Sequence, residues 1–135
     1  LGDSRLLESV QRRWTKEIDG FYDVDYMTRL RFLNLFSIKG RLLRCDLIKY
    51  WKCLHSDPAS GLCDLFVRAP NIGTRGHSLK LSISCSQTSC KQRFFGVRCI
   101  NIWNSLPAEL VQCQSLHAFK GGLVEALGDL LYHFD

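Results

Sequence analysis

Residues 37–54, with the sequence SIKGRLLRCDLIKYWKCL, show most clearly which fold class this chain adopts. Apolar residues recur here at spacings of three and four, the period of an α-helix with one buried face. The apolar positions are Leu43, Leu47, Tyr50, Trp51 and Leu54. The cationic positions Arg41, Arg44, Lys49 and Lys52 lie broadly opposite. The segment therefore predicts a helix that begins near Ser37, buries one face and exposes a basic one.

The N-terminal segment repeats this design. An apolar stripe predicts a helix over residues 5–18 that follows Ser4 and is sealed against a core through the stripe. The stripe consists of Leu6, Leu7, Val10, Trp14 and Ile18. The basic residues of this helix, Arg5, Arg12, Arg13 and Lys16, project onto the opposite face. Asp25 is placed to cap a short second helix that runs through Leu33.

The second half of the chain alternates loop signals with apolar patterns. Residues 56–61 and 68–78 are rich in loop formers, and the alternation over residues 79–84 predicts a short strand or hairpin. Residues 88–106 are apolar nearly all round, which predicts a buried helix stopped by Pro107. Ser115 is placed to cap a last helix. Its stripe is Leu116, Phe119, Leu123, Leu127, Leu130 and Phe134.

Composition sets the class of protein. The chain has 135 residues, of which 46% are apolar, so one mainly α-helical domain over residues 1–135 is expected, with about five helices and the small β element. No apolar run approaches the roughly 20 residues that cross a bilayer, so no membrane association is expected. The net charge is +5, and all the excess positive charge lies before residue 108. That bias is compatible with a polyanionic partner.

The cysteines indicate the compartment. Their number, seven, is odd and their spacings are irregular, which predicts free and mostly buried thiols in a reducing intracellular compartment. Cys85, Cys90 and Cys99 together with His77 could in principle supply four zinc ligands, but no CxxC pair is present. We therefore expect no metal site and no cofactor.

Six short motifs follow one another along the chain. They are residues 7–16 (LESVQRRWTK), 44–48 (RCDLI), 74–78 (TRGHS), 94–98 (FFGVR), 103–107 (WNSLP) and 119–120 (FK). In this order and spacing they resemble the C-terminal region of reverse transcriptases encoded by non-LTR retrotransposons of the chicken-repeat and Jockey-like groups. The resemblance covers roughly residues 5–127.

The resemblance implies a helical fragment of a larger polypeptide, downstream of the polymerase palm and thumb. That parent polypeptide is expected to be an RNA-directed DNA polymerase acting in the nucleus, the cytoplasm or both. The fragment itself has no acidic metal site of the polymerase kind, so it is expected to be no enzyme alone. Its expected role is an accessory domain that contacts template RNA or target DNA during target-primed reverse transcription, with the upstream palm and thumb as further partners. The alternative is a bracing or protein-interaction module without nucleic-acid contact.

The candidate nucleic-acid contacts are the basic faces of the two long helices and one loop. They are Arg5, Arg12, Arg13, Lys16, Arg41, Arg44, Lys49, Lys52, Arg75 and His77. Lysine and arginine gain affinity for nucleic acid by releasing condensed counterions, whereas the alternative is an ordinary solvated face. For the loop pair Arg75 and His77, a structural role in capping or core pairing is slightly favoured. Trp51, Trp103 and the two phenylalanines 94 and 95 are expected in the core rather than as stacking platforms.

Overall fold

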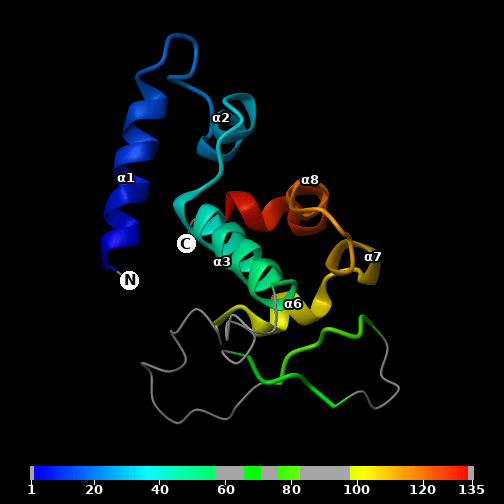
Figure 1. Ribbon diagram of the computed structural model, residues 1–135. Coiled ribbons are helices and arrows are strands. Elements are labelled where there is room, and N and C mark those ends of the chain that lie inside the picture. Colours follow the sequence, from blue (N-terminus) through cyan, green and yellow to red (C-terminus); the bar gives the residue numbers. More distant parts are fainter. Residues whose placement is uncertain (1, 57–65, 71–75, 83–97, 134–135) are drawn as a thin grey trace. The chain divides into compact units, whose positions relative to one another are not determined.

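The computed structural model describes residues 2–56, 66–70, 76–82 and 98–133, and these are mainly helical, which confirms the predicted fold class (Figure 1). The α-helices among them are α1 (Gly2–Lys16), α2 (Tyr26–Phe32), α3 (Ile38–Leu54), α6 (Ile100–Ser105), α7 (Ala108–Val111) and α8 (Leu116–Leu127). A 3-10 helix, η3 (Gly128–Tyr132), follows α8. None of these described helices is both long and apolar enough to cross a membrane.

The chain divides into two compact units, which we describe separately. The first unit comprises Leu1–Arg44 and Leu127–Asp135, and the second comprises Cys45–Ala126. The expectation that all 135 residues form one domain stays a prediction.

In the first unit, α1 packs through polar residues and not through its apolar stripe. Four residues of its apolar stripe, Leu6, Leu7, Val10 and Trp14, have exposed fractions between 53% and 72%. The buried positions are instead Glu8 (7% exposed) and Thr15 (4%). The prediction that the apolar stripe seals α1 against a core is therefore wrong. Its start is also earlier than expected, since Ser4 lies inside the first turn.

The polar contacts of Glu8 explain this packing. The Glu8 carboxylate accepts a hydrogen bond from the backbone N–H of Ile38 at 2.7 Å and another from the Tyr26 hydroxyl at 2.5 Å. It thereby satisfies a free N–H at the start of α3 from a different helix. Gln11 Nε2 adds hydrogen bonds to the Phe36 carbonyl at 3.0 Å and to the Tyr26 hydroxyl oxygen at 3.1 Å. These charge-assisted and amide bonds hold the polar face of α1 inward.

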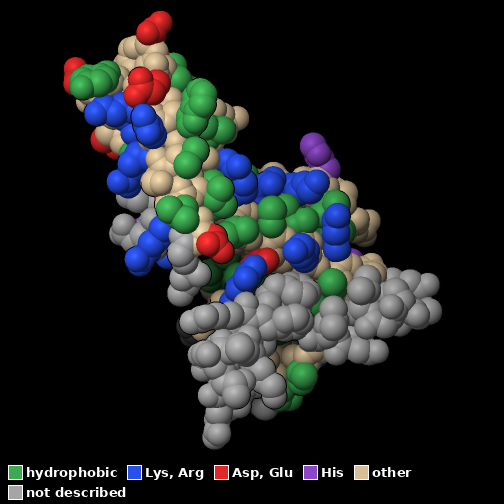
Figure 2. Space-filling view, turned by 90° about the vertical axis from the view of Figure 1, so that its left-hand side faces the viewer, with side chains coloured by type: hydrophobic (Ala, Val, Ile, Leu, Met, Phe, Trp, Pro, Cys, Tyr) green, Lys and Arg blue, Asp and Glu red, His purple; other side chains and the backbone are tan. Residues whose placement is uncertain are grey.

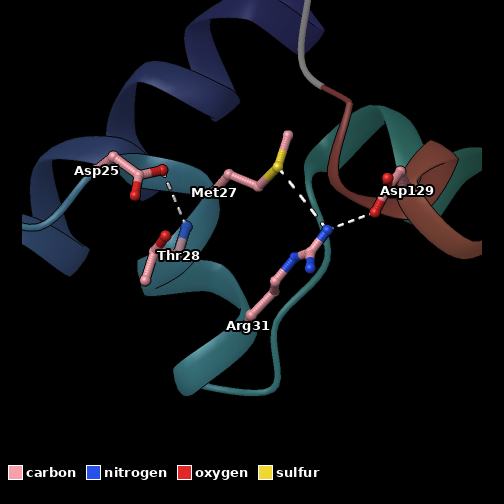
Figure 3. A network of polar contacts seen from close by, with 5 residues as sticks. All are labelled: Asp25, Met27, Thr28, Arg31 and Asp129. Atoms are coloured by element: carbon pink, nitrogen blue, oxygen red, sulfur yellow. Dashed lines mark hydrogen bonds and ion pairs between the residues drawn. The ribbon is translucent and has the colours of Figure 1, made fainter.

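The cap of α2 is the predicted one. Asp25 Oδ1 accepts a hydrogen bond from the Thr28 backbone N–H at 3.1 Å. Hydrogen bonds from Thr28 lower the pKa of the Asp25 carboxyl below its ordinary value. At the other end of this helix, Arg31 forms an ion pair with Asp129 and lies beside the Met27 sulfur, as Figure 3 shows. The ion pair is exposed and contributes little to stability.

The start of α3 also confirms the prediction. The Ser37 hydroxyl accepts a hydrogen bond from the Gly40 backbone N–H at 3.0 Å, which makes Ser37 the N-terminal cap. The Ser37 backbone N–H donates to the Leu131 carbonyl at 3.0 Å, so η3 is tied to this turn. Gly40 faces the same carbonyl so closely that a Cβ built on it would lie 2.1 Å from the oxygen. Only glycine fits this approach.

The core of the second unit surrounds Trp103, which is fully buried. The Trp103 indole N–H donates to the Leu79 carbonyl at 2.9 Å, and Tyr50 and Phe119 pack their rings near it. Both predictions that Trp51 and Trp103 are core residues are confirmed by their burial, while phenylalanines 94 and 95 lie outside the described residues. The predicted buried helix is described only from residue 98 onward.

The β element among the described residues is an isolated antiparallel bridge between Arg68 and Leu81, and only Leu81 lies in the predicted segment 79–84. The side chain of Asn104, in α6, forms two hydrogen bonds with the backbone of Leu81 in this bridge. Its side-chain oxygen accepts from the Leu81 backbone N–H and its amide donates to the Leu81 carbonyl, both at 2.8 Å. The Asn104 side chain thus pairs with this segment as a neighbouring strand would. Residues 83 and 84 of the predicted strand lie outside the described residues.

The last helix begins as predicted and ends earlier. The Ser115 hydroxyl accepts a hydrogen bond from the Ala118 N–H at 3.1 Å. Gly128, with φ +47°, ends α8, and the chain continues as η3. This change of helix type moves the apolar register, so Leu131 is fully buried whereas Leu130 is 49% exposed. The predicted place of Leu130 on the buried stripe is therefore wrong.

Candidate nucleic-acid interface

The basic face of α1 is exposed, as its sequence predicts. Arg5, Arg12, Arg13 and Lys16 are all exposed. Three of them, Arg5, Arg12 and Lys16, are separated by seven and four residues and therefore form one row along the helix. At 1.5 Å per residue the row is about 16 Å long. Lys and Arg side chains are numerous on the face of the molecule drawn in Figure 2.

Aromatic rings position two cations of this row. The Arg12 guanidinium carbon lies 4.9 Å from the ring centroid of Tyr26, and the Lys16 ammonium nitrogen lies 4.4 Å from that of Tyr22. Such contacts restrict the long side chains without neutralising their charge. The row therefore keeps its positive charge at the surface while losing part of its conformational freedom.

Arg29 of α2 adds a positive charge beside the basic row of α1. No pattern in the sequence indicated that Arg29 would be buried there. It is 4% exposed, and its guanidinium donates to the Val24 carbonyl at 3.1 Å and to the Arg12 carbonyl at 3.3 Å. Its carbon lies 5.5 Å from the centroid of Tyr26. Tyr26 is thus in contact with both Arg12 and Arg29, and no ion pair to Arg29 is found among the described residues. The arginine guanidinium is permanently charged in proteins, so Arg29 adds a positive charge beside Arg12.

The predicted basic residues of α3 are placed differently from one another. Arg41 is exposed and donates to the Gln11 side-chain oxygen at 3.2 Å in the first unit. Arg44 is half-buried, with its guanidinium carbon 6.0 Å from the ring centroid of Phe36. Lys49 and Lys52 are exposed on the part of α3 that belongs to the second unit. Arg41, Lys49 and Lys52 are thus exposed at the surface, and Arg44 is only partly exposed.

The loop pair gives one clear result. Arg75 lies outside the described residues. His77 is buried, at 3% exposed, and its Nε2 lies 3.0 Å from the Trp103 carbonyl oxygen. Its ring also meets the Trp103 ring edge-on, with centroids 5.9 Å apart. Because His77 is buried, it does not lie among the exposed contact residues. Its position agrees with the core role that was the alternative for it.

A second polar cluster contains residues of two of the six motifs, 44–48 and 94–98. Asp46 is buried and accepts a hydrogen bond from Arg98 Nε at 2.6 Å. The Cys99 thiol lies 3.5 Å from the same carboxylate oxygen. Burial, followed by the nearby Asp46 charge, raises the pKa of Cys99 to about 12. Cys99 therefore lies beside the buried carboxylate of Asp46 as a neutral thiol, which is a poor nucleophile.

The cysteines and metal ligands are described in part. Cys45, Cys53, Cys99 and Cys113 are free thiols. Among the residues that the structure describes, no group of three or more His, Cys, Asp or Glu side chains could hold a metal ion. Residues 85 and 90, which the zinc alternative would need, lie outside the described part.

Comparison of the chain with protein-family models, with curated proteins and with solved structures finds no match.

Proposed function

We propose that this chain is a non-catalytic nucleic-acid-binding module, which contacts template RNA or target DNA as an accessory domain of a retrotransposon reverse transcriptase. The proposal rests on the resemblance of the six motifs for the parent polypeptide and on the basic face of α1 for the contact. The parent supplies the polymerase activity, and this chain supplies binding.

The orientation of α1 carries the proposal. Glu8 and Gln11 turn the polar face inward, and this leaves the row of Arg5, Arg12 and Lys16 exposed. By the helical rotation of about 100° per residue, the carboxylates of Asp3 and Glu17 lie more than about 100° away from this row. Glu8 lies between Arg5 and Arg12 on the helix, but its carboxylate is buried and accepts hydrogen bonds from the Ile38 N–H and the Tyr26 hydroxyl. A row about 16 Å long can meet several successive phosphates of one strand.

Salt dependence is the property that this arrangement determines. Each phosphate neutralised by a cation releases condensed counterions, so log Kd rises with log salt by about 0.9 per contact for duplex DNA and about 0.7 for a single strand. Loss of three contacts should thus reduce the slope by roughly two to three. Sequence preference should hardly change, because phosphate contacts position a protein without reading bases.

The test is fluorescence anisotropy with a 20-nucleotide RNA and a 20-base-pair DNA, between 50 and 200 mM KCl. The triple variant Arg5→Gln, Arg12→Gln, Lys16→Gln should bind more weakly with the shallower slope. A matched control, Arg68→Gln, Lys80→Gln, Lys120→Gln, also lowers the net charge from +5 to +2 but changes no residue of the row. It should retain the wild-type slope.

Two outcomes would contradict the proposal. Equal slopes for both triple variants would show that only net charge matters. No binding by the wild-type chain would favour the bracing alternative. Circular dichroism melts of all three proteins accompany the titrations to show that each variant is folded. The exposed substitutions at Arg5, Arg12 and Lys16 should change stability by under about 0.5 kcal/mol each.

A further inference from the structure

Helix α1 is docked in the first unit with few buried side chains, and none of these is apolar. Among residues 3–16 the buried side chains are those of Glu8 and Thr15, whereas Leu7 and Trp14 are 57% and 72% exposed. Burial of apolar surface is the main favourable contribution when elements of a protein pack together. The apolar stripe contributes little of it here, so the docking of α1 depends on polar contacts.

Two of these polar contacts are made by the carboxylate of Glu8. One oxygen accepts a hydrogen bond from the Ile38 N–H at 2.7 Å, and the other accepts one from the Tyr26 hydroxyl at 2.5 Å. Ile38 is the first residue of α3, so its N–H has no partner within that helix, and the helix dipole favours a carboxylate at this end. We call the Glu8 carboxylate, the Ile38 N–H and the Tyr26 hydroxyl the Glu8 latch.

Gln11 supplements the latch with weaker bonds. Its side-chain amide donates to the Phe36 carbonyl at 3.0 Å and to the Tyr26 hydroxyl oxygen at 3.1 Å. Hydrogen bonds to a charged group are roughly twice as strong as those between neutral groups. Because the buried carboxylate of Glu8 accepts two such bonds, it contributes more to the docking of α1 than the amide of Gln11 does.

We propose that the Glu8 latch holds α1 in a docked state, and that α1 is released as one unit when the latch opens. The connection to α2 contains Gly20 at φ +85°, and glycine reaches backbone conformations that other residues rarely adopt. Helix α1 has 15 residues, and an isolated helix of this length is marginal in water. Released α1 therefore loses its helical structure.

Release breaks up the basic row of α1. Arg5, Arg12 and Lys16 share one side only while α1 is helical. Release also breaks the hydrogen bond of 3.3 Å from Arg29 to the Arg12 carbonyl, and it separates the Arg12 guanidinium from the Tyr26 ring. Nucleic acid thus binds the docked state, and an open latch weakens binding by the same coupling. This regulation rests on the proposed function, whereas the latch itself rests on the contacts of Glu8.

Hydrogen exchange of the 135-residue chain tests the latch without nucleic acid. Exchange of the backbone amides is followed by mass spectrometry at increasing urea concentrations below the unfolding transition. The urea dependence of an opening scales with the surface that the opening exposes. Release of α1 exposes less surface than unfolding of the chain. The amides of α1 should therefore exchange with a weaker urea dependence than those of residues 47–54 in α3.

Two matched variants test the role of Glu8. Glu8→Gln keeps the shape of the side chain and removes its charge. The α1 amides of this variant should exchange at least about ten-fold faster than in the wild type, with the same weak urea dependence, because hydrogen bonds to a charged group are weakened. Glu17→Gln makes the same chemical change at an exposed position, and its α1 amides should exchange at the wild-type rate. Tyr26→Phe removes one of the two donors to Glu8, and it should accelerate exchange by about two- to ten-fold.

The same exchange measurement with the 20-nucleotide RNA or the 20-base-pair DNA tests the regulation. A ligand that binds only the docked state opposes release of α1 by mass action. At a concentration about 100-fold above its Kd, the nucleic acid should slow exchange of the α1 amides by about 100-fold.

Three results would overturn the proposal. Equal urea dependence for α1 and for residues 47–54 of the wild type would show that α1 does not open separately, even where Glu8→Gln fails to fold. Equal α1 exchange in Glu8→Gln and Glu17→Gln would show that Glu8 is no latch. Nucleic acid that binds but leaves α1 exchange unchanged would refute the regulation. A wild-type chain that binds no nucleic acid would contradict the proposed function, and exchange without nucleic acid would still decide the latch.

Discussion

Replacing Gly40 with alanine should destabilise the protein although alanine is the better helix former. Gly40 lies in the first turn of α3, and a Cβ built there would meet the Leu131 backbone at 2.1 Å from the oxygen, 2.5 Å from the carbonyl carbon and 2.6 Å from Cα. All three neighbours are backbone atoms, so no side-chain rotation relieves the contact. The chain at Leu131 must therefore move by about 1 Å to reach ordinary van der Waals distances.

The magnitude follows from three contributions. Overpacking costs about 1–3 kcal/mol. Moving Leu131 also weakens the hydrogen bonds that its carbonyl accepts from the Ser37 N–H at 3.0 Å and the Ser37 hydroxyl at 3.1 Å, each worth about 0.5–1.5 kcal/mol. The gain in helix propensity from Gly to Ala offsets about 1 kcal/mol. The expected loss in the free energy of unfolding is thus about 2–4 kcal/mol.

Gly121 is the matched control. It also lies inside a helix, α8, and a Cβ built there has no atom within 4 Å, so Gly121→Ala should stabilise by about 1 kcal/mol. Gly122 is intermediate, because its Cβ would meet only the end of the Leu110 side chain, at 2.6 Å. Urea unfolding followed by circular dichroism measures all three variants. A Gly40→Ala protein as stable as Gly121→Ala would refute the close approach of α3 and η3.

Two further predictions concern titratable groups. Iodoacetamide should modify exposed Cys45 of the folded protein much faster than buried Cys99, because burial raises the pKa of Cys99 to about 12. Peptide mass spectrometry measures the two rates, and equal rates would contradict this prediction. In guanidinium without reductant all seven cysteines should react, as expected for reduced thiols. Burial and the hydrogen bond to Glu8 raise the pKa of Tyr26 from 10 to about 12, so its stabilising contribution is complete below pH 10 and is lost as the pH rises to 12. Urea unfolding between pH 9 and 12 should show a loss of at most roughly 3 kcal/mol from this group, and the Tyr26→Phe variant should lose less over that range than the wild type.

The helices and their caps could be predicted because they depend on neighbours in the sequence. Asp25, Ser37 and Ser115 each accept a hydrogen bond from a backbone N–H three residues later. A cap of this kind needs only a short polar side chain at one position. The apolar period of residues 43–54 likewise identified the buried face of α3, on which Leu47, Tyr50, Trp51 and Leu54 lie.

The candidate site could be predicted only in part. The basic residues of α1 are exposed as expected, whereas the burial of His77 was only the slightly favoured one of two alternatives and the burial of Arg29 was not predicted. Both depend on contacts between segments far apart along the chain, such as the 26 residues between His77 and Trp103. Local periodicity carries no information about such pairs.

The sequence by itself determined that the chain is mainly helical, where several helices start, and that α1 has a basic face and an apolar face. Only the tertiary structure decided which face of α1 is turned inward. Amphipathicity measures the preference of a face for water, and it favoured burial of the stripe with Leu7 and Trp14. The carboxylate of Glu8 instead meets the free N–H of Ile38 and the Tyr26 hydroxyl, two donors that another part of the chain supplies. Hydrogen bonds to a buried charge are strong and depend on geometry, so they overrode the apolar pattern and left the apolar stripe exposed.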